Sequence, residues 1–340
     1  MPRYLVTGAS GFIGGHVVER LIADGHDVRC LLRKSSSRRY LPVERVHWTE
    51  GDLNSPESLR AAVADCDGVV HLGGLTSARN EQELSITNGQ GTENLARACI
   101  SQSNPPVFIY MSSIAASGPI GETRPRTEDD PPAPISAYGR SKRSGEITLE
   151  RLAGQLPTSI LRPGIVFGPR NTELLPAFRS ICHFHLHAVP GIFPPKLSLI
   201  DVSDLVELTI RCLAQGRRLK ATPETEPTGV GPGIYFATAS EFPTYAEFGR
   251  LIAQATSTSY VVHLPLLPPV PWFAALISES IAHLRGKATT FNRDKIREAS
   301  ATNWACTSER ARRELDFLPS APLLQQLRES AEWYRQAGWL

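Results

Sequence analysis

The sequence predicts an α/β fold in which a doubly wound parallel β-sheet is followed by a smaller mixed α/β portion. Two observations lead to this prediction. Apolar runs typical of strands alternate with amphipathic helical patterns through the first half of the chain, and a glycine-rich turn follows the first run. Strands that alternate with helices form parallel sheets covered by helices on both faces. The 340 residues are enough for one large domain or two unequal ones.

The expected elements of the first half follow from hydrophobic periodicity. Strands are short apolar runs, whereas helices repeat apolar residues every three or four positions, as Val17, Leu21 and Ile22 do. The expected strands are residues 3–7, 27–32, 45–49, 68–72, 106–112 and 158–161, and the expected helices are residues 11–24, 55–64, 81–101 and 137–153.

The turn after the first strand carries three glycines at a spacing of three residues and opens the first helix. Gly8 allows a tight turn, Gly11 lets the backbone approach phosphates, and Gly14 lets the helix pack closely on its strand. Backbone N–H groups at such a helix N-terminus bind a pyrophosphate. In this strand-to-helix context the motif predicts a Rossmann-type dinucleotide site. The residues expected to contact the cofactor here are Gly8, Ser10, Gly11, Phe12, Ile13 and Gly14.

The chain changes character after Pro169, where Pro and Gly become frequent and the expected elements are mixed. Helices are expected at residues 202–214, 245–255, 271–285, 308–314 and 322–337, and a strand at residues 234–237 that can rejoin the main sheet. We expect residues 1–169 to form an NAD(P)-binding domain and residues 170–340 a substrate-binding portion. Segments near 196–214 and 233–238 are expected to return to the main domain.

Charge and cysteine content narrow the function classes. The 36 basic and 34 acidic residues nearly balance, so no long-range field favours nucleic acid, and we expect no nucleic-acid partner. The six cysteines are scattered without paired spacing, which favours a reduced, cytoplasmic setting. The first strand already belongs to the nucleotide fold, so the N-terminus does not resemble a signal peptide.

The most apolar later stretch is residues 264–284. It contains four prolines and Glu279, so we expect no integral membrane segment. Its helical part is amphipathic and contains Trp272, Phe273, Leu276, Ile277 and Ile281. We expect this helix to belong to the core or to cover a pocket, with peripheral membrane contact as the alternative.

Tyr138 and Lys142 lie four residues apart near the start of an expected helix, so the phenol and the ammonium share one face. The unperturbed tyrosine pKa is about 10, so acid–base work near pH 7 requires a shift of about three units, or ~4 kcal/mol. A neighbouring lysine and a cationic nicotinamide ring both lower that pKa. Ser112 and Ser113 end the fifth strand, at the sheet edge where ligands bind. We expect one serine to be structural and Ser113 to be catalytic.

Together these motifs resemble those of the extended short-chain dehydrogenases/reductases, which include nucleotide-sugar epimerases and dehydratases. The glycine loop, Gly51-Asp52-Leu53, Ser112-Ser113 and the Tyr138/Lys142 pair match the family in order and spacing. The resemblance extends into the second half through the stretches 161–169 and 199–205 and through Trp304. Within this family, its sequence motifs most resemble those of the 3β-hydroxysteroid dehydrogenase and dihydroflavonol reductase branch.

The resemblance implies a role for each matched residue. Tyr138 exchanges a proton with the substrate oxygen, Lys142 lowers its pKa and holds the nicotinamide ribose, and Ser113 positions the substrate oxygen. Asn88 matches a family helix motif, where packing and site roles are both open. The resemblance also allows a homodimer built from the third helix and the Tyr138 helix. Further residues implied to contact the cofactor are Asp52, Leu53, Leu72, Gly73, Gly74, Pro163 and Val166.

The end of the second strand indicates which dinucleotide is bound. NAD-selective sites place an acidic residue there to bind the ribose 2′-hydroxyl. This chain instead has Arg33 followed by Lys34, Arg38 and Arg39. A guanidinium can hold a 2′-phosphate through two parallel hydrogen bonds, and Ser10 can add another. We therefore expect NADP(H), with NAD(H) as the alternative.

The residues around the reacting centre favour one reaction class. Family dehydratases place an acidic pair directly after the catalytic hydroxyl, whereas Ser113 is followed by Ile114-Ala115-Ala116. We expect a hydride transfer between the nicotinamide and a carbonyl or secondary alcohol of a fairly apolar small molecule. A nucleotide-sugar epimerase with tightly bound NAD is the alternative, and a non-catalytic NADP(H)-sensing protein is a third hypothesis.

Three histidines alternate in the segment His183-Phe-His185-Leu-His187. If this segment is a strand, the three rings share one side, and neutral imidazoles suit zinc. No acidic residue or cysteine nearby has convincing ligand spacing, so we expect no metal. A lid or substrate contact is the preferred hypothesis for the cluster.

Overall fold

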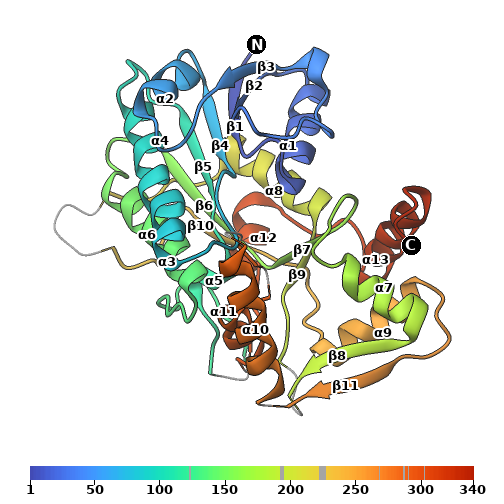
Figure 1. The fold of residues 1–340 in the computed structure, drawn as a ribbon. Coiled ribbons are helices and arrows are strands. Elements are labelled where there is room, and N and C mark those ends of the chain that lie inside the picture. Colours follow the sequence, from blue (N-terminus) through green and yellow to red (C-terminus); the bar gives the residue numbers. More distant parts are fainter. Residues whose placement is uncertain are drawn as a thin grey trace.

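The computed structural model describes residues 1–340 except 122–123, 192–194, 222–226, 268, 286–287, 290 and 302. Its centre is a seven-stranded parallel sheet in the order β10-β6-β5-β4-β1-β2-β3 (Figure 1). The predicted α/β fold is confirmed. The strands of this sheet are β1 (Arg3–Thr7), β2 (Asp27–Leu32), β3 (His47–Glu50), β4 (Gly68–His71), β5 (Val107–Met111), β6 (Thr158–Pro163) and β10 (Ile234–Ala237).

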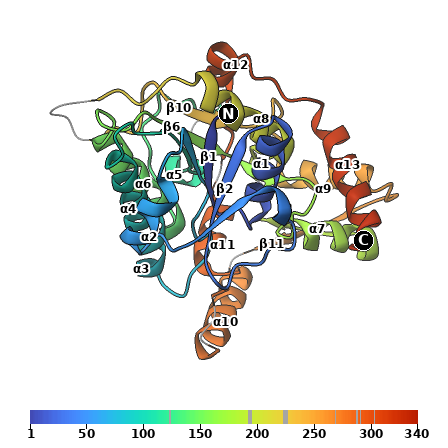
Figure 2. The ribbon, with the colours of Figure 1, turned by 90° about the horizontal axis from the view of Figure 1, so that it is seen from above.

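Helices cover both faces of the sheet, because every central strand is apolar on both sides. Val6, Val70 and Ile109 belong to one core, with residues of α1 (Phe12–Ala23) and α8 (Val202–Gln215). Leu5 and Phe108 belong to the other. The helices over this second core are α2 (Pro56–Val63), α4 (Gly91–Ile100) and α6 (Ala137–Arg151). The two helical layers lie on opposite sides of the sheet (Figure 2).

The second half adds two small parallel strand pairs and a third core. β7 (Ile165–Phe167) pairs with β9 (Leu199–Asp201), and β8 (Leu186–Pro190) pairs with β11 (Val262–Leu266). Phe178, Phe248 and Tyr334 belong to the third core. The helices of this half are α7 (Leu175–Phe184), α9 (Tyr245–Ala255), α10 (Val270–Leu284), α11 (Arg293–Ala299), α12 (Glu309–Leu315) and α13 (Leu323–Gln336).

The helix expected over residues 81–101 is interrupted. It consists of α3 (Glu81–Leu84), a π-helical turn (Ser85–Gln90) and α4, so one wide turn divides it. Asn88 lies in this turn. Its side-chain amide forms hydrogen bonds with Leu75 and Ser141, which lie outside the helix. Such wide turns often occur at functional sites. A further short helix, α5 (Ile114–Ser117), follows β5 directly.

The idea that the three histidines share one strand is wrong. α7 continues through Phe184, and His185 ends it in the left-handed conformation, with φ of 57°. Only His187 lies in β8, where its Nε2 is 3.0 Å from the Tyr245 carbonyl oxygen. Within the part of the chain that the structure describes, no three His, Cys, Asp or Glu side chains are grouped to hold a metal ion.

α10 lines a cavity, as expected for a helix that covers a pocket, but its apolar face does not belong to the core. Within the described residues, no helix has the length and apolar character needed to cross a bilayer. The side chains of Phe273, Leu276, Ile277 and Ile281 are exposed rather than part of the core, because α10 packs through its opposite face. Trp272, on that opposite face, lines a cavity instead.

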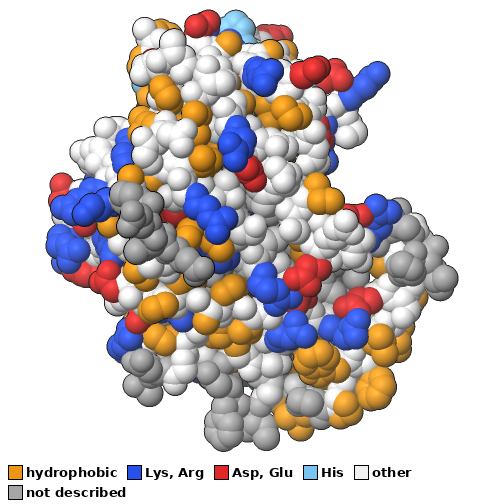
Figure 3. Space-filling model, turned by 90° about the vertical axis from the view of Figure 1, so that its left-hand side faces the viewer, with side chains coloured by type: hydrophobic (Ala, Val, Ile, Leu, Met, Phe, Trp, Pro, Cys, Tyr) orange, Lys and Arg blue, Asp and Glu red, His pale blue; other side chains and the backbone are white. Residues whose placement is uncertain are grey.

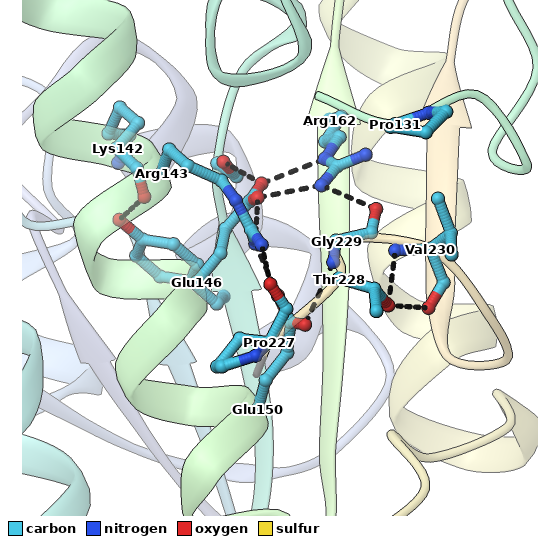
Figure 4. Close-up of polar contacts among 12 residues, drawn as sticks. Pro131, Lys142, Arg143, Glu146, Glu150, Arg162, Pro227, Thr228, Gly229 and Val230 are labelled. Atoms are coloured by element: carbon cyan, nitrogen blue, oxygen red, sulfur yellow. Dashed lines mark hydrogen bonds and ion pairs between the residues drawn. The ribbon is translucent and has the colours of Figure 1, made fainter. Parts of the chain in front are cut away.

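A fully buried ion pair connects α6 to the sheet (Figure 4). The Arg162 guanidinium in β6 donates to both carboxylate oxygens of Glu146 in α6, at 2.8 and 2.7 Å. The Ser112 hydroxyl, just beyond β5, donates to the same carboxylate at 2.6 Å, and Arg143 lies 3.2 Å from it. Both Glu146 and Arg162 have no exposed surface. One carboxylate therefore binds α6 to the ends of two neighbouring strands.

The electrostatics of this cluster favour the charged state of Glu146. Burial alone raises the pKa of the Glu146 carboxyl, but Arg162, Arg143 and the Ser112 hydroxyl together bring that pKa below its ordinary value. Arg143 and Arg162 also donate to the carbonyl oxygens of Pro227 and Gly229, which extends the network to the loop before β10.

Removing one partner of this pair should destabilise the protein strongly. We expect Arg162→Leu to lower the free energy of unfolding by about 3–5 kcal/mol, because it leaves a buried carboxylate without its main counter-ion. The measurement is urea unfolding followed by circular dichroism. Arg79→Leu breaks an exposed pair with Glu83 and should cost about 0–1 kcal/mol. Equal, small effects of the two substitutions would contradict the structural role of the buried pair.

Candidate active site

The glycine turn leaves no room for side chains at two of its positions. Gly8 has φ of +70°, and a Cβ there would lie 2.7 Å from the Leu72 carbonyl carbon. A Cβ on Gly14 would lie 2.2 Å from the Gly8 carbonyl oxygen, whereas the nearest atom to a Cβ on Gly15 is 3.6 Å away. Gly11 is the N-cap of α1 and has extended backbone geometry. Glycine at these two positions thus lets the turn lie against the loop after β4 and lets α1 begin close to the turn.

The other expected cofactor residues lie at the carboxyl ends of the parallel strands, beside this turn. Arg33 is exposed directly after β2, and the Asp52 carboxylate accepts from the Asn54 amide at 2.8 Å after β3. Leu53 packs against Gly73, which follows β4 with Leu72 and Gly74. Pro163 ends β6, and Val166 lies in β7. Ser10, Phe12 and Ile13 lie in the turn itself and in the first turn of α1.

His71, at the end of β4, has a structural role. Its Nδ1 is 2.7 Å from the Thr7 hydroxyl, and its Nε2 is 3.0 Å from the Thr92 hydroxyl. Burial, with a smaller effect of Lys142, lowers the pKa of His71 to about 3. The ring is therefore neutral and links two strands to α4.

Asn88 joins the loop after β4 to the helix that carries Tyr138. Its side-chain amide accepts from the Leu75 amide at 2.8 Å and donates to the Leu75 carbonyl and the Ser141 hydroxyl, both at 2.9 Å. The Ser141 hydroxyl in turn donates to the Tyr138 carbonyl at 2.7 Å. These contacts show a packing role for Asn88 that holds the 73–75 backbone in place.

The two serines after β5 have different surroundings. Ser112 is buried, and its hydroxyl is committed to Glu146. Ser113 is half-buried and caps α5 by accepting from the Ala115 amide at 3.1 Å, and its hydroxyl lowers the pKa of the Tyr138 phenol. Of the two hydroxyls, Ser113 is therefore the one placed to meet a substrate oxygen beside Tyr138.

Two lysines lie near the reacting centre, one of them unexpected from sequence. The Lys142 Nζ is buried 4.7 Å from the centre of the Tyr110 ring, and burial lowers the pKa of Lys142 to about 8. The Lys295 Nζ, from α11, lies 5.5 Å from the centre of the Tyr138 ring. Lys295 is thus the cation that lies over the candidate catalytic ring.

The short helix α11 also holds the start of α6 in place. The Asp294 carboxylate accepts from the Ala137 amide at 2.6 Å and from the Tyr138 amide at 3.4 Å, where a helix N-terminus favours negative charge. The Glu298 carboxylate accepts from the Ser136 hydroxyl at 2.5 Å and from the Lys295 ammonium at 2.9 Å. Residues about 160 positions apart in the chain therefore fix the position of Tyr138.

The pKa of Tyr138 reflects these contacts. Burial raises the pKa of Tyr138 to about 12, while Lys295 and the hydrogen bond with Ser113 lower it and the Glu298 and Glu173 carboxylates raise it. At neutral pH the phenol therefore keeps its proton and can donate it.

A cavity of about 420 Å³ opens beside Tyr138. Residues 76–81 and Leu84 line one side, and side chains of α10 and α11 line the other. Among the described residues, four cationic side chains line it, and each is in an ion pair. The pairs are Arg79–Glu83, Arg293–Glu279, Lys295–Glu298 and Arg297–Asp294.

Comparison with known proteins identifies the protein family to which this fold and site belong. Residues 4–224 match the model of the NAD dependent epimerase/dehydratase family. The chain is 26% identical to a ceramide reductase of Caulobacter vibrioides, over 98% of this chain and 95% of that protein. It is 24% identical to a decarboxylating sterol-4-alpha-carboxylate 3-dehydrogenase of Saccharomyces cerevisiae, over 97% of each. The structure of a UDP-glucose 4-epimerase from Thermotoga maritima superposes with a TM-score of 0.77 at 21% identity, covering 98% of this chain and 99% of that one.

The chain belongs to the NAD dependent epimerase/dehydratase family. It is therefore an enzyme of the extended short-chain dehydrogenase/reductase type, and the predicted resemblance is confirmed.

The contrast between Gly14 and Gly15 tests the cofactor cradle. We expect Gly14→Ala to weaken dinucleotide binding by at least about ten-fold, because the new methyl group forces the turn and the helix apart. Gly15→Ala should bind normally, since a methyl group fits there and alanine favours the helix. Binding is measured by NADPH fluorescence. Equal affinities of the two variants would contradict the assignment of this turn.

Proposed function

We propose that the protein is an NADP(H)-dependent reductase of a carbonyl group on a fairly apolar small molecule, working reversibly as an alcohol dehydrogenase. The observation that supports this most directly is the position of Tyr138. Tyr138 lines the cavity, and the Ser113 hydroxyl, directly beyond β5, lowers the pKa of its phenol. Ser113 and the glycine turn both follow strands at the carboxyl edge of the sheet. When bound, the nicotinamide supplies or accepts the hydride.

The residues of this chain then provide the proton and its positioning. In reduction, the protonated Tyr138 donates to the substrate oxygen as negative charge develops there, and Ser113 holds that oxygen by a hydrogen bond. Lys142 is placed to hold the ribose near Gly74, because its Nζ lies 3.7 Å from where a Gly74 Cβ would be. Asp294 and Glu298 keep the start of α6 fixed, so Tyr138 stays aimed at the cavity.

The lining of the cavity supports an uncharged substrate over a nucleotide sugar. Among the described lining residues, each of the four cationic side chains has a carboxylate partner that offsets its charge, which makes the cavity less attractive to a diphosphate. Trp272, Leu84 and Ala282 supply apolar surface. Two of the relatives are named for ceramide and for a sterol carboxylate, both built on a large apolar framework.

Tyr138→Phe tests the proposed chemistry. We expect turnover of ketones and aldehydes with NADPH to fall by about 10²–10⁴-fold with NADPH affinity unchanged, because only the proton donor is lost. Tyr260→Phe, which alters an exposed tyrosine, is the control. The assay follows nicotinamide absorbance across ketones, aldehydes and UDP-hexoses. Conversion of UDP-hexoses without net cofactor consumption would contradict a reductase, and a function indifferent to Tyr138→Phe would indicate a sensor.

Arg33 is proposed to select the phosphorylated cofactor. We expect Arg33→Ala to weaken NADPH binding by roughly ten- to a hundred-fold, which is the loss of a charge-assisted hydrogen bond, and to leave NADH binding unchanged. Arg45→Ala removes another exposed arginine and should change neither. Affinities for both nucleotides are compared by fluorescence titration. A wild-type preference for NADH would overturn the assignment.

Lys295 should control the pH dependence of the reverse reaction. Alcohol oxidation requires Tyr138 to accept a proton, so its rate rises with pH as the phenol ionises. Removing the Lys295 charge raises the pKa of Tyr138 further, so Lys295→Met should move this rise to higher pH by about half to one unit. Lys295→Arg should keep the wild-type profile. Superimposable profiles for all three proteins would show that Lys295 does not act on Tyr138.

A further inference from the structure

Exposed apolar side chains are concentrated in one segment. Fourteen large hydrophobic residues of the described chain are exposed, and ten of them lie between Tyr260 and Phe291. Soluble surfaces carry such residues singly, and a contiguous group marks an interaction site. The ten are Tyr260, Val262, Leu264, Leu267, Val270, Phe273, Leu276, Ile277, Ile281 and Phe291.

α10 carries five of these ten residues and has two distinct faces. Val270, Phe273, Ile277 and Ile281 recur at helical spacing and are 63%, 60%, 59% and 45% exposed. On the opposite side, Trp272, Glu279 and Ala282 line the cavity beside Tyr138. The face turned to solvent is thus the apolar one.

The shape of this surface is convex. α10 projects beyond the body of the molecule when seen from above (Figure 2), and hydrophobic side chains gather at the lower right of the space-filling view, where α10 lies (Figure 3). A projecting helix with aromatic and branched side chains suits a fluid surface that adapts to it, whereas a protein partner must supply a shaped complement.

The charges of residues 260–291 also suit a lipid surface. Residues 260–291 contain a single acidic residue, Glu279, and two basic residues, Arg285 and Lys287. Glu279 is bound to Arg293 at 2.7 Å on the cavity side, and Arg285 is exposed at the end of α10. Basic residues at the border of an apolar helix face meet lipid phosphates. The chain as a whole is nearly neutral, so the apolar face provides most of the attraction.

We propose that α10 and its flanking residues 260–285 bind the surface of a lipid bilayer, with Phe273, Ile277 and Ile281 inserted among the acyl chains. This inference goes beyond the proposed reaction and does not depend on it.

The test is sedimentation of the full-length protein with vesicles of phosphatidylcholine and phosphatidylglycerol. We expect wild-type protein to sediment with the vesicles, and the triple variant Phe273→Gln, Ile277→Gln, Ile281→Gln to lose at least about ten-fold in partitioning. The matched control changes three exposed apolar residues elsewhere, Ile86→Gln, Phe184→Gln and Leu318→Gln, and should bind as wild type. Thermal midpoints and NADPH affinities equal to wild type establish that the variants are folded.

Three results would overturn the proposal. Wild-type protein that stays in the supernatant shows that the surface does not bind lipid, and equal loss in both triple variants shows that the effect is not specific to α10. A wild-type dimer that becomes monomeric in the α10 variant, with no vesicle binding in either, would make this face an interface between two copies. No assay of turnover is needed, so failure of the proposed reaction and failure of this proposal remain distinguishable.

Discussion

The position of α6 depends on the buried ion pair between Glu146 and Arg162. The carboxylate also accepts from Ser112, so one group fixes a helix against the ends of β5 and β6 at once. Shifting α6 by a single turn would leave a fully buried guanidinium without its carboxylate, at a cost of several kcal/mol. The pair therefore makes other registers of α6 less stable. It thereby determines the positions of Tyr138, Ser141 and Lys142 on that helix.

A second constraint acts at the other end of the helix and comes from the second half of the chain. Asp294 and Glu298 of α11 accept from the first groups of α6, while Lys295 lies over the Tyr138 ring. The two halves of the chain thus meet at Tyr138, the candidate proton donor. The position of Tyr138 therefore depends both on α11, at the start of α6, and on the Glu146 cluster further along that helix.

Sequence reasoning was strongest where local pattern and chemistry coincide. Strand and helix alternation predicted the sheet, and the glycine spacing predicted a tight turn at Gly8, where φ is +70°. It was weakest where distant segments meet. Lys295 is one of three cations on a seven-residue helix, with no motif that signals its contact with Tyr138. The π-helical turn at Asn88 and the end of α7 at His185 likewise depend on tertiary contacts and on one left-handed residue, which periodicity does not show.

The most direct test of the central claim is to follow the hydride itself. NADPH carrying deuterium at both C4 positions of the nicotinamide is incubated with the protein and an apolar ketone, and the product is analysed by mass spectrometry. If the nicotinamide transfers its hydride to the ketone while Tyr138 donates the proton, the alcohol carries one deuterium on the new carbinol carbon. The Tyr138→Phe variant should form no such product. An alcohol without deuterium, or no alcohol alongside epimerised UDP-hexose, would contradict the proposed reaction.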